Sequence, residues 1–232
     1  MQRIIVSGAS RGIGLEFVRQ LLARGERVIA ACRQPGKALK LTELAAAHPG
    51  RLHILPLRLD SERSIKELAR EAGMLTDTLD AVINNAGMLV SGERFGELAA
   101  ATFSETLTTN AIGPLLLTQA LAPLLERGAT PRVVNVSSDL GSLAATHAFQ
   151  TPSYCMSKAA LNMATRLLAA ELRTRGVIVI SINPGWVKTD MGGAKAPLAV
   201  TESVGGMLAV IDRLRAADNG RFFDHAGTAL AW

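Results

Sequence analysis

Residues 3–14 read RIIVSGASRGIG, a short apolar run that leads into a glycine-rich turn. Gly8 permits a tight turn, while Gly12 and Gly14 let backbone approach an anion and let a following helix pack closely on a sheet. The amino end of that helix would offer free N–H groups and a partial positive charge to a phosphate. A glycine-rich turn without a ligand looks the same, but its place directly after a strand favours a dinucleotide pyrophosphate site.

The rest of the chain alternates apolar runs of strand length with longer segments of helical periodicity. Continuous runs such as Val177-Ile178-Val179-Ile180 are typical of strands that are buried on both faces of a parallel sheet. The expected strands are Arg3–Ser7, Arg27–Cys32, Leu52–Leu57, Leu79–Asn84, Arg132–Ser137, Val177–Asn183 and Arg221–Asp224. The expected helices are Gly12–Arg24, Lys37–His48, Ser61–Gly73, Phe95–Arg127, Ser153–Arg175 and Thr201–Ala217.

This alternation predicts an α/β fold, a Rossmann-type doubly wound parallel sheet of about seven strands with helices on both faces. No linker rich in Pro, Gly or Ser divides the chain and no repeat at solenoid spacing is visible. Residues 1–232 are therefore expected to form a single domain. Ligands bind such sheets at the carboxyl ends of the strands, so functional residues are expected directly after strands.

The composition is that of an ordinary globular protein, with 48% hydrophobic residues, 19% charged residues and a net charge of +5. The charge would suit an anionic small ligand, but Lys and Arg are scattered, so no nucleic-acid partner is expected. The spacing of Cys32 and Cys155 suggests neither a disulfide framework nor a metal site. No signal segment or membrane-spanning stretch is visible, which makes the cytoplasm the expected compartment and excludes a membrane partner.

The end of the second expected strand indicates which dinucleotide would bind. An acidic residue usually stands there in NAD sites, where it grips the ribose hydroxyls. Here Cys32 takes that place and Arg33 follows, while the glycine-rich turn contributes Arg11. Two guanidinium groups would suit a 2′-phosphate, which arginine binds through forked, charge-assisted hydrogen bonds. The alternative is that Arg33 is a solvated strand end, but the pair of arginines and the missing acid favour NADP(H).

Polar residues also follow the third and fourth strands. Asp60 could cap the next helix, accept a hydrogen bond from the adenine amino group, or both. Asn84-Asn85-Ala86-Gly87 is a small polar corner suited to lie along the adenosine ribose. Taken alone, it is equally well a plain turn.

Asn110-Ala111-Ile112-Gly113-Pro114 interrupts the long fourth helical segment, because Asn, Gly and Pro all weaken a helix. The interruption is either a helix boundary or a bend that frees backbone groups. In a bend, Asn110 could order a water molecule.

Ser138 ends the fifth expected strand, and Tyr154 and Lys158 then open a helix four residues apart on one face. Tyr154 is the only tyrosine in the chain. A free phenol has a pKa near about 10, poorly matched to proton donation at neutral pH. The Lys158 ammonium and an oxidised nicotinamide ring would both lower it, and Ser138 could hold the substrate oxygen at the same point. The spacing alone also fits a surface tyrosine with a solvated lysine; the order of all these motifs favours the catalytic interpretation.

Together these residues resemble the short-chain dehydrogenase/reductase family over essentially the whole chain. The resemblance rests on Ser7–Gly14, Asn84–Gly87, Asn110, Ser138, Tyr154, Lys158 and the run Pro184-Gly185-Trp186-Val187-Lys188-Thr189. A longer Ser138–Tyr154 segment, a short Asp190–Val200 region and the chain's ending resemble the sniffer/C-factor group of carbonyl reductases. Of the adjacent serines, Ser137 is the less favoured catalyst, because the second usually faces the site.

The resemblance implies roles for each matched position. Ser138 would polarise a carbonyl, Tyr154 would protonate it, Lys158 would bind the nicotinamide ribose, and Asn110 would hold a relay water. Val187 would meet the carboxamide through its backbone, and Thr189 the phosphates or amide. The cofactor NADP(H) would be bound by Gly8, Ser10, Arg11, Gly12, Ile13, Gly14, Arg33, Asp60, Asn84, Ala86, Gly87, Tyr154, Lys158, Pro184, Gly185, Val187 and Thr189.

The expected function is hydride transfer between NADPH and an aldehyde or ketone. Substrate would contact Ser138, Tyr154, His147, Phe149 and Trp186, with Met88, Leu89, Gln150 and Met191 as further pocket candidates. The short region after Thr189 suggests an open pocket for small or medium carbonyl compounds.

Three other functions were compared with this one. A redox-sensing protein that binds NADP(H) without turnover would not need the four catalytic residues. An epimerase or dehydratase needs a larger C-terminal substrate region, and a methyltransferase has no use for Tyr154 and Lys158. The leucine- and alanine-rich fourth and fifth helices suggest a homodimer or homotetramer, although burial within one subunit would explain them equally well.

Overall fold

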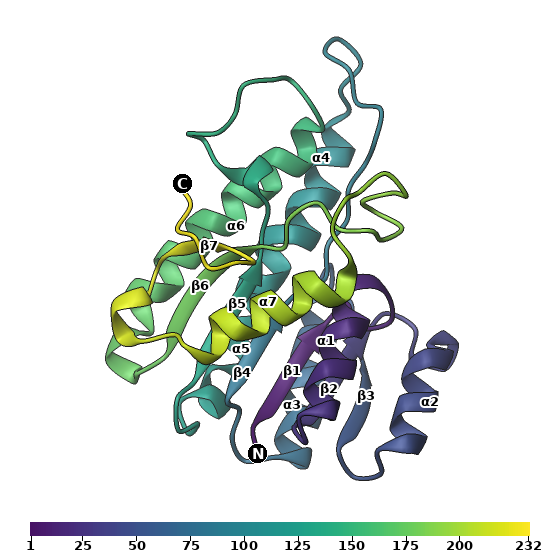
Figure 1. The fold of residues 1–232 in the computed structure, drawn as a ribbon, viewed down its shortest axis with the longest axis vertical. Coiled ribbons are helices and arrows are strands. Elements are labelled where there is room, and N and C mark those ends of the chain that lie inside the picture. The colour runs from purple at the N-terminus through teal and green to yellow at the C-terminus, as the bar shows by residue number, and fades with distance from the viewer.

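The computed structural model describes residues 1–232 and contains one seven-stranded parallel sheet, with strand order β3-β2-β1-β4-β5-β6-β7. Its strands are β1 (Arg3–Ser7), β2 (Arg27–Cys32), β3 (Leu52–Pro56), β4 (Ala81–Asn84), β5 (Arg132–Val136), β6 (Ile178–Asn183) and β7 (Phe222–Asp224). Figure 1 shows the sheet running through the middle of the molecule between two layers of helices. The doubly wound α/β fold expected from the sequence is confirmed.

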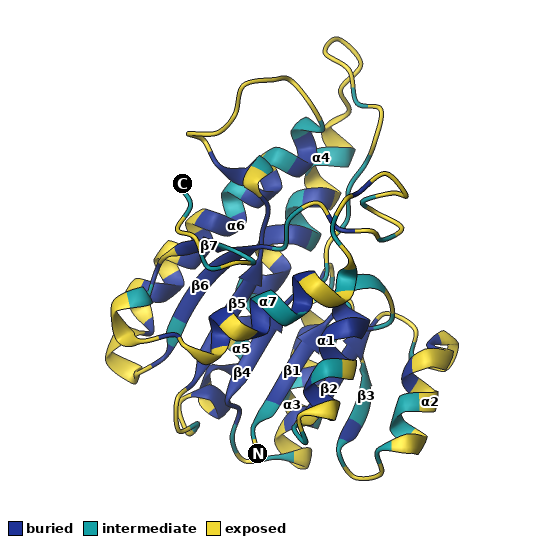
Figure 2. Cartoon of the chain, in the orientation of Figure 1, coloured by how far each residue is buried: buried dark blue, intermediate teal, exposed yellow.

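Each face of the sheet is covered by its own set of helices. The helices are α1 (Gly12–Ala23), α2 (Leu39–Ala47), α3 (Glu62–Leu75), α4 (Ala100–Leu107), α5 (Gly113–Leu125), α6 (Pro152–Glu171) and α7 (Val200–Asp212). Helices α1, α2 and α7 share one buried cluster with the strands, while α3, α5 and α6 share the other. Figure 2 shows the central strands as buried, the edge strand β3 as mostly intermediate and the outer helix faces as exposed. The apolar strand runs are therefore explained by burial on both sides.

The chain order reverses between β1 and β4, which pair in parallel beside each other. At such a switch point the loops that follow the two strands diverge to opposite faces and leave a crevice at the carboxyl edge. The glycine-rich turn follows β1 at Ser7, and the Asn-Asn-Ala-Gly corner follows β4 at Asn84. The fold therefore brings these two motifs together.

The segment expected as one helix from Phe95 to Arg127 is divided in the structure. Helix α4 ends at Leu107, a π-helical turn covers Thr108–Ile112, and α5 continues from Gly113. A π turn inserts an extra residue and disturbs the regular pattern of backbone hydrogen bonds. The helical conformation continues through the π turn, so the interpretation of the interruption as a helix boundary is wrong.

The ranges expected for two other helices extend beyond the carboxyl ends that the structure shows. Helix α6 ends at Glu171 and is followed by a 3₁₀ turn, and α7 ends at Asp212 rather than Ala217. Before α2, Pro35–Lys37 forms a separate 3₁₀ turn. None of the helices combines the length and apolarity that crossing a bilayer requires.

Candidate active site

The glycine-rich turn after β1 is held in place by the corner after β4. The Asn85 side-chain amide donates to the carbonyl oxygens of Ser7 (3.0 Å) and Gly8 (3.3 Å), and the Ser7 hydroxyl accepts from the backbone N–H groups of Asn85 (3.0 Å) and Ala86 (3.1 Å). A Cβ atom on Gly14 would collide with the Gly8 carbonyl and lie 2.5 Å from Asn85 Nδ2. The turn is thus a cradle of backbone with no room for side chains at Gly8 or Gly14.

Asn84, expected at the adenosine ribose, has its side chain inside the sheet. It is buried, and its amide donates to Asn135 Oδ1 on β5 (2.8 Å) and Thr118 Oγ1 on α5 (3.1 Å). The Asn84 side chain is therefore not available to contact the adenosine ribose, and only its backbone could do so. The same polar chain continues from Asn135 Nδ2 to Thr165 Oγ1 on α6 (2.8 Å), and from there to Ser181 on β6 (2.8 Å). These hydrogen bonds tie α6 to the centre of the sheet.

The residues expected to recognise the 2′-phosphate differ in exposure. Arg11 and Arg33 are both exposed, whereas Cys32 is buried in the core cluster on the α1 side of the sheet. Burial raises the pKa of the Cys32 thiol. An aspartate introduced at this position would therefore be a buried carboxylate, so Arg33 is the better position for a test of cofactor preference.

Asp60 is paired with Arg58 through two hydrogen bonds, of 3.2 and 2.8 Å. The Arg58 hydrogen bond holds the pKa of Asp60 below its ordinary value, and the charge of Arg33 acts in the same direction, so Arg33 lies on this side of the molecule. The suggestion that Asp60 caps α3 is wrong: Ser61 is the cap and accepts from the Ser64 N–H at 3.3 Å. Contact with adenine remains a prediction, and Arg58 competes for the same carboxylate.

Ser138 follows β5 and begins a short 3₁₀ turn, Asp139–Gly141, that packs against α6. Its hydroxyl accepts from the Leu140 N–H (3.2 Å) and donates to Asp139 Oδ1 (3.1 Å). A Cβ on Gly141 would lie 2.7 Å from the Lys158 backbone, so only glycine allows this turn to approach the helix. Ser137 points elsewhere: it is buried and donates to Asn162 Oδ1 at 2.7 Å.

Tyr154 and Lys158 lie on the inner face of α6, and both are buried. The Lys158 Nζ atom donates to the Val136 carbonyl (2.7 Å) and lies 5.6 Å from the centre of the Tyr154 ring. Gly87 lies beside Asn110 and Lys158, since a Cβ at that position would lie 3.4 Å from Asn110 Oδ1 and 3.7 Å from Lys158 Nζ. The structure therefore brings Gly87, Asn110, Tyr154 and Lys158 into one group.

Asn110 occupies the π turn, and its side chain is fully used within the protein. It is buried, exchanges two hydrogen bonds of 2.8 Å with the backbone of Met88, and donates to the Ser157 hydroxyl at 2.9 Å. Ser157 in turn donates to the Tyr154 carbonyl at 2.7 Å. A water at this site would therefore bind backbone groups of the π turn rather than the Asn110 amide.

The direction of the Tyr154 pKa shift differs from the sequence-based expectation. Burial raises the pKa of Tyr154 to about 12; hydrogen bonding with Ser138 works in the opposite direction, and the charge of Asp139 adds to the rise. Burial also lowers the pKa of Lys158 to about 8. The cost of charging groups in a buried site therefore outweighs the expected attraction between phenolate and ammonium.

Two long loops rise above these residues at the carboxyl edge of the sheet, at the top of Figure 1. They comprise residues 85–99 and 142–151. Glu93 Oε2 accepts from the Ser153 hydroxyl (2.8 Å), and the rings of Phe95 and Phe149 meet edge to face with centres 5.7 Å apart. His147 is exposed and makes no hydrogen bond. Phe149 thus pairs with Phe95 on an exposed loop, and no recorded contact connects His147 to Ser138 or Tyr154.

A third segment approaches the site after β6. Lys188 N donates to the Leu198 carbonyl (2.9 Å), which folds residues 187–198 back on themselves. Thr189 faces the glycine-rich turn, 3.5 Å from where a Gly12 Cβ would stand. Trp186 is exposed and donates through Nε1 to the Gly192 carbonyl (2.8 Å). Pro184 at its base accepts from Ser203 at 2.7 Å, which fixes the segment to α7.

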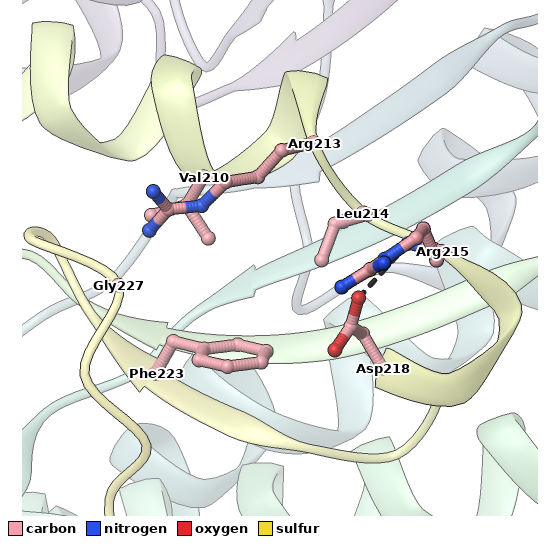
Figure 3. A pocket seen from close by; sticks show the side chains of 7 residues that line it. All are labelled: Val210, Arg213, Leu214, Arg215, Asp218, Phe223 and Gly227. Atoms are coloured by element: carbon pink, nitrogen blue, oxygen red, sulfur yellow. Dashed lines mark hydrogen bonds between the residues drawn. The ribbon is translucent and has the colours of Figure 1, made fainter.

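The hollow drawn in Figure 3 is a different feature. It has a volume of about 430 Å³ and is lined by Val210, Arg213, Leu214, Arg215, Asp218, Phe223 and Gly227. It lies where α7 ends, and α7 begins at the carboxyl edge of the sheet, so the hollow lies toward the opposite edge. No residue of the candidate site lines it.

Comparison with known proteins identifies the family. Residues 2–197 match the sequence model described as short chain dehydrogenase. The chain belongs to the short-chain dehydrogenase family. This short-chain dehydrogenase is 46% identical over 157 residues to the C-signal of Myxococcus xanthus, covering 68% of this chain and 95% of the relative. It is 34% identical over 236 residues to the 1-hydroxy-2-glutathionyl-2-methyl-3-butene dehydrogenase of Rhodococcus sp. strain AD45, covering both chains completely.

Solved structures of short-chain dehydrogenases superimpose closely on this one. The NADPH-bound carbonyl reductase from chicken fatty liver has a TM-score of 0.95 and 40% identity, covering 100% of this chain and 99% of that one. The carbonyl reductase Sniffer of D. melanogaster has a TM-score of 0.96 and 33% identity, covering both chains completely. The expected resemblance to sniffer-type carbonyl reductases is therefore confirmed.

Several residues of this site were missed at the level of sequence. Asn85, rather than Asn84, holds the glycine-rich turn, and its signal was only the second place in an asparagine pair. Ser157 joins Asn110 to the Tyr154 helix, a link across 47 positions that no local pattern reveals. Asp139 was visible beside Ser138, but its contact with the serine hydroxyl depends on the 3₁₀ turn.

Proposed function

We infer that this short-chain dehydrogenase reduces aldehydes or ketones with NADPH. The observation that carries the proposal is the convergence of Ser138, Tyr154, Lys158 and Asn110 at the carboxyl edge of the sheet, beside the glycine-rich turn. Solved relatives with the same fold contain NADPH or NADP. The geometry and the relatives support the same chemistry.

The residues present fit an NADP-type dinucleotide. The backbone cradle has no room for a side chain at Gly8 or Gly14, and Gly12 has a φ of +54° that favours glycine. The amino end of α1 offers a partial positive charge to a pyrophosphate there. Arg11 and Arg33 are exposed and available to a 2′-phosphate. When bound, NADPH supplies the hydride, and its oxidised ring supplies a positive charge near the phenol.

The protein's own groups would handle the carbonyl oxygen. Ser138 would donate to that oxygen, and Tyr154 would transfer its hydroxyl proton to it as the alkoxide forms. A pKa of about 12 keeps the Tyr154 phenol protonated at neutral pH, so the proton is present, and the positive charge of the oxidised cofactor would lower that pKa toward the range in which a phenol donates readily. Lys158, with a pKa of about 8, carries a proton at neutral pH and could replace the one that Tyr154 gives up. The π turn at Asn110 offers backbone groups for a water between Lys158 and solvent.

The direct test measures NADPH consumption with a panel of small and medium aldehydes and ketones. We expect turnover by the natural protein and at least a thousandfold lower kcat for Tyr154→Phe, since the proton donor is lost while the ring remains. NADPH affinity of the variant, measured by fluorescence, should stay within a few fold. Full turnover by folded Tyr154→Phe would refute the mechanism.

Cofactor preference has its own test at Arg33. Arg33→Ala should weaken NADPH binding by about tenfold, because a charge-assisted hydrogen bond to phosphate contributes on the order of 1–2 kcal/mol. NADH, which lacks the 2′-phosphate, should bind the variant and the natural protein equally well. Equal losses for both cofactors would contradict the assignment to NADP(H).

A second candidate is an NADP(H)-binding protein that senses or signals without turnover. The relative with 46% identity over 157 residues is named C-signal, which gives this candidate a specific basis. NADPH binding without consumption across the whole carbonyl panel, in the natural protein, would favour it. Turnover would exclude it as the sole function.

Self-association remains a prediction. Its support is an exposed apolar stripe on α6 formed by Met156, Met163 and Leu167. Sedimentation velocity of the natural protein and of Met163→Glu would test it. A homodimer or homotetramer that dissociates in the variant is the expected result, and a monomeric natural protein would refute it.

A further inference from the structure

Asp139 places a carboxylate directly beside the catalytic serine. Its Oδ1 atom accepts from the Ser138 hydroxyl (3.1 Å) and from the Leu140 N–H (3.0 Å), while Oδ2 forms no hydrogen bond. The side chain is exposed. No basic side chain pairs with it, because Asp139 takes part in none of the ion pairs of the protein. Its negative charge therefore stands uncompensated at the place where a substrate would bind.

The backbone that carries Asp139 is rigidly fixed relative to the site. Gly141 in the same 3₁₀ turn packs directly on the Lys158 backbone, and its carbonyl accepts from Asn162 Nδ2 at 3.1 Å. Ser137, just before the turn, donates to Asn162 Oδ1 at 2.7 Å. The backbone of Asp139 therefore keeps its position beside Ser138, and the hydrogen bonds of Oδ1 to Ser138 and Leu140 orient the carboxylate.

We propose that Asp139 determines substrate charge: it selects against carbonyl compounds that carry an anionic group near the carbonyl, and favours neutral and cationic ones. The proposal rests on the proposed function, because the substrate oxygen is taken to bind at Ser138 and Tyr154. Asp139 Oδ1 lies 3.1 Å from the Ser138 hydroxyl, so a charged group next to a carbonyl that binds Ser138 would lie on the order of 6 Å from the carboxylate, two hydrogen-bond lengths away. At an effective dielectric constant between about 30 and 80, repulsion at that distance lowers kcat/KM of an anionic substrate by about 3-fold to 20-fold.

The charge of Asp139 already reaches the reacting phenol. Together with burial, it raises the pKa of Tyr154. Among the other groups around Tyr154, the Lys158 ammonium lies 5.6 Å from the ring centre and opposes the charge of Asp139. Glu93 is a second carboxylate, bonded to Ser153. Cys155 acts on the phenol in the same direction as Asp139. The same field acts on any charge that a substrate brings to this point.

Asp139→Asn is the informative variant, because asparagine can still accept from Leu140 and Ser138 and so preserves the turn. The substrates are three benzaldehydes of similar shape that carry a carboxylate, a methyl ester or a trimethylammonium group at the ring position opposite the aldehyde. The para substituent lies on the order of 10 Å from Asp139, so we expect the carboxylate-to-ester ratio of kcat/KM to rise by about 2-fold to 6-fold in the variant, and the ammonium-to-ester ratio to fall. Asp212→Asn, an exposed aspartate on α7, is the matched control and should leave both ratios unchanged.

A second measurement does not depend on turnover. Tyr154 is the only tyrosine, so tyrosinate absorbance in alkaline solution reports this one phenol. Asp139→Asn should ionise it at lower pH than the natural protein, with folding followed by circular dichroism. Unchanged ratios, or an unchanged phenol titration, would overturn the proposal. If no benzaldehyde is reduced by the natural protein, the proposed function fails, and the titration still decides whether the Asp139 charge acts on the site.

Discussion

Arg11 Nη1 lies 3.0 Å from Asp190 Oδ2, so the glycine-rich turn and the segment after β6 are joined by an ion pair across 179 positions of sequence. Both side chains are largely exposed, with 71% and 77% of their surfaces accessible. Arg11 is also the arginine expected to bind the 2′-phosphate. The carboxylate of Asp190 is therefore a competitor for a group that the cofactor needs.

Asp190→Asn should tighten NADPH binding by about 2-fold to 5-fold, since exposed ion pairs contribute roughly 0–1 kcal/mol. NADH binding should change less, because it has no phosphate for the released guanidinium. The measurement is a fluorescence titration at low and moderate salt. Asp212→Asn, which removes the exposed partner of Arg24 at a similar distance of 2.9 Å, is the control. Equal tightening in both variants would show only a general effect of net charge.

Gly14→Ala should abolish measurable NADPH binding and lower the melting temperature, because the new Cβ collides with the Gly8 carbonyl and the Asn85 amide. Gly73→Ala is the matched control: Gly73 also lies in a helix, but nothing stands within 4 Å of its added Cβ. That variant should keep full binding and gain about 0.5–1 kcal/mol in unfolding free energy. A Gly14→Ala protein that binds NADPH with unchanged affinity would contradict the conclusion that the backbone leaves no room for a Cβ at Gly14.

Gly141→Ala should lower kcat/KM for aldehydes by at least tenfold. Its Cβ would lie 2.7 Å from the Lys158 backbone, so the turn carrying Ser138 must move away from the Tyr154 helix. NADPH affinity should fall much less, since the glycine-rich turn is untouched. Gly205→Ala, whose Cβ would meet only Gln20 at 3.7 Å, serves as the control. Parallel losses of affinity and turnover would point to general unfolding instead.

The buried amine of Lys158 should make stability depend on pH. Its folded pKa of about 8 lies below the ordinary 10.5, so the unfolded chain binds more protons between these values. Unfolding free energy therefore rises with pH in this window, by about 2 kcal/mol between pH 7 and pH 9.5. The raised pKa of Tyr154 acts only above its ordinary value of 10, where stability falls again.

Urea titrations of the natural protein and Lys158→Met at these two pH values provide the test. The difference in unfolding free energy between them should shift in favour of the natural protein at the higher pH. Lys66→Met removes an exposed lysine that pairs with Glu62 and should show no such shift. A constant difference for Lys158→Met would mean that its amine is not perturbed.

The sequence was sufficient for the fold class and for the seven strands of the parallel sheet. Period and composition identify buried strands, and a parallel sheet then places the residues after β1, β4 and β5 at one edge. The sequence was insufficient to predict which side of the sheet a side chain at the end of a strand faces. Whether Asn84 or Asn85 faces the glycine-rich turn depends on where the pleat of β4 ends, and Cys32 faces the core for the same kind of reason.

The pKa of Tyr154 was the least accessible quantity from sequence. The four-residue spacing to Lys158 was read as an attraction, but the cost of removing both groups from water depends on the depth of the site. Depth is set by contacts between distant segments, such as Gly141 against α6. No local pattern contains that information.

The chain of hydrogen bonds from Asn84 through Asn135 and Thr165 to Ser181 has a consequence for how this fold can diversify. If α6 shifted by one turn, Thr165 would lose its partners and leave several buried hydrogen-bonding groups unpaired. A purely apolar interface would tolerate such a shift. These hydrogen bonds thus fix the position of α6 along the sheet. The loops above the crevice can therefore change in sequence and accept new substrates, while the Tyr154 hydroxyl on α6 keeps its position.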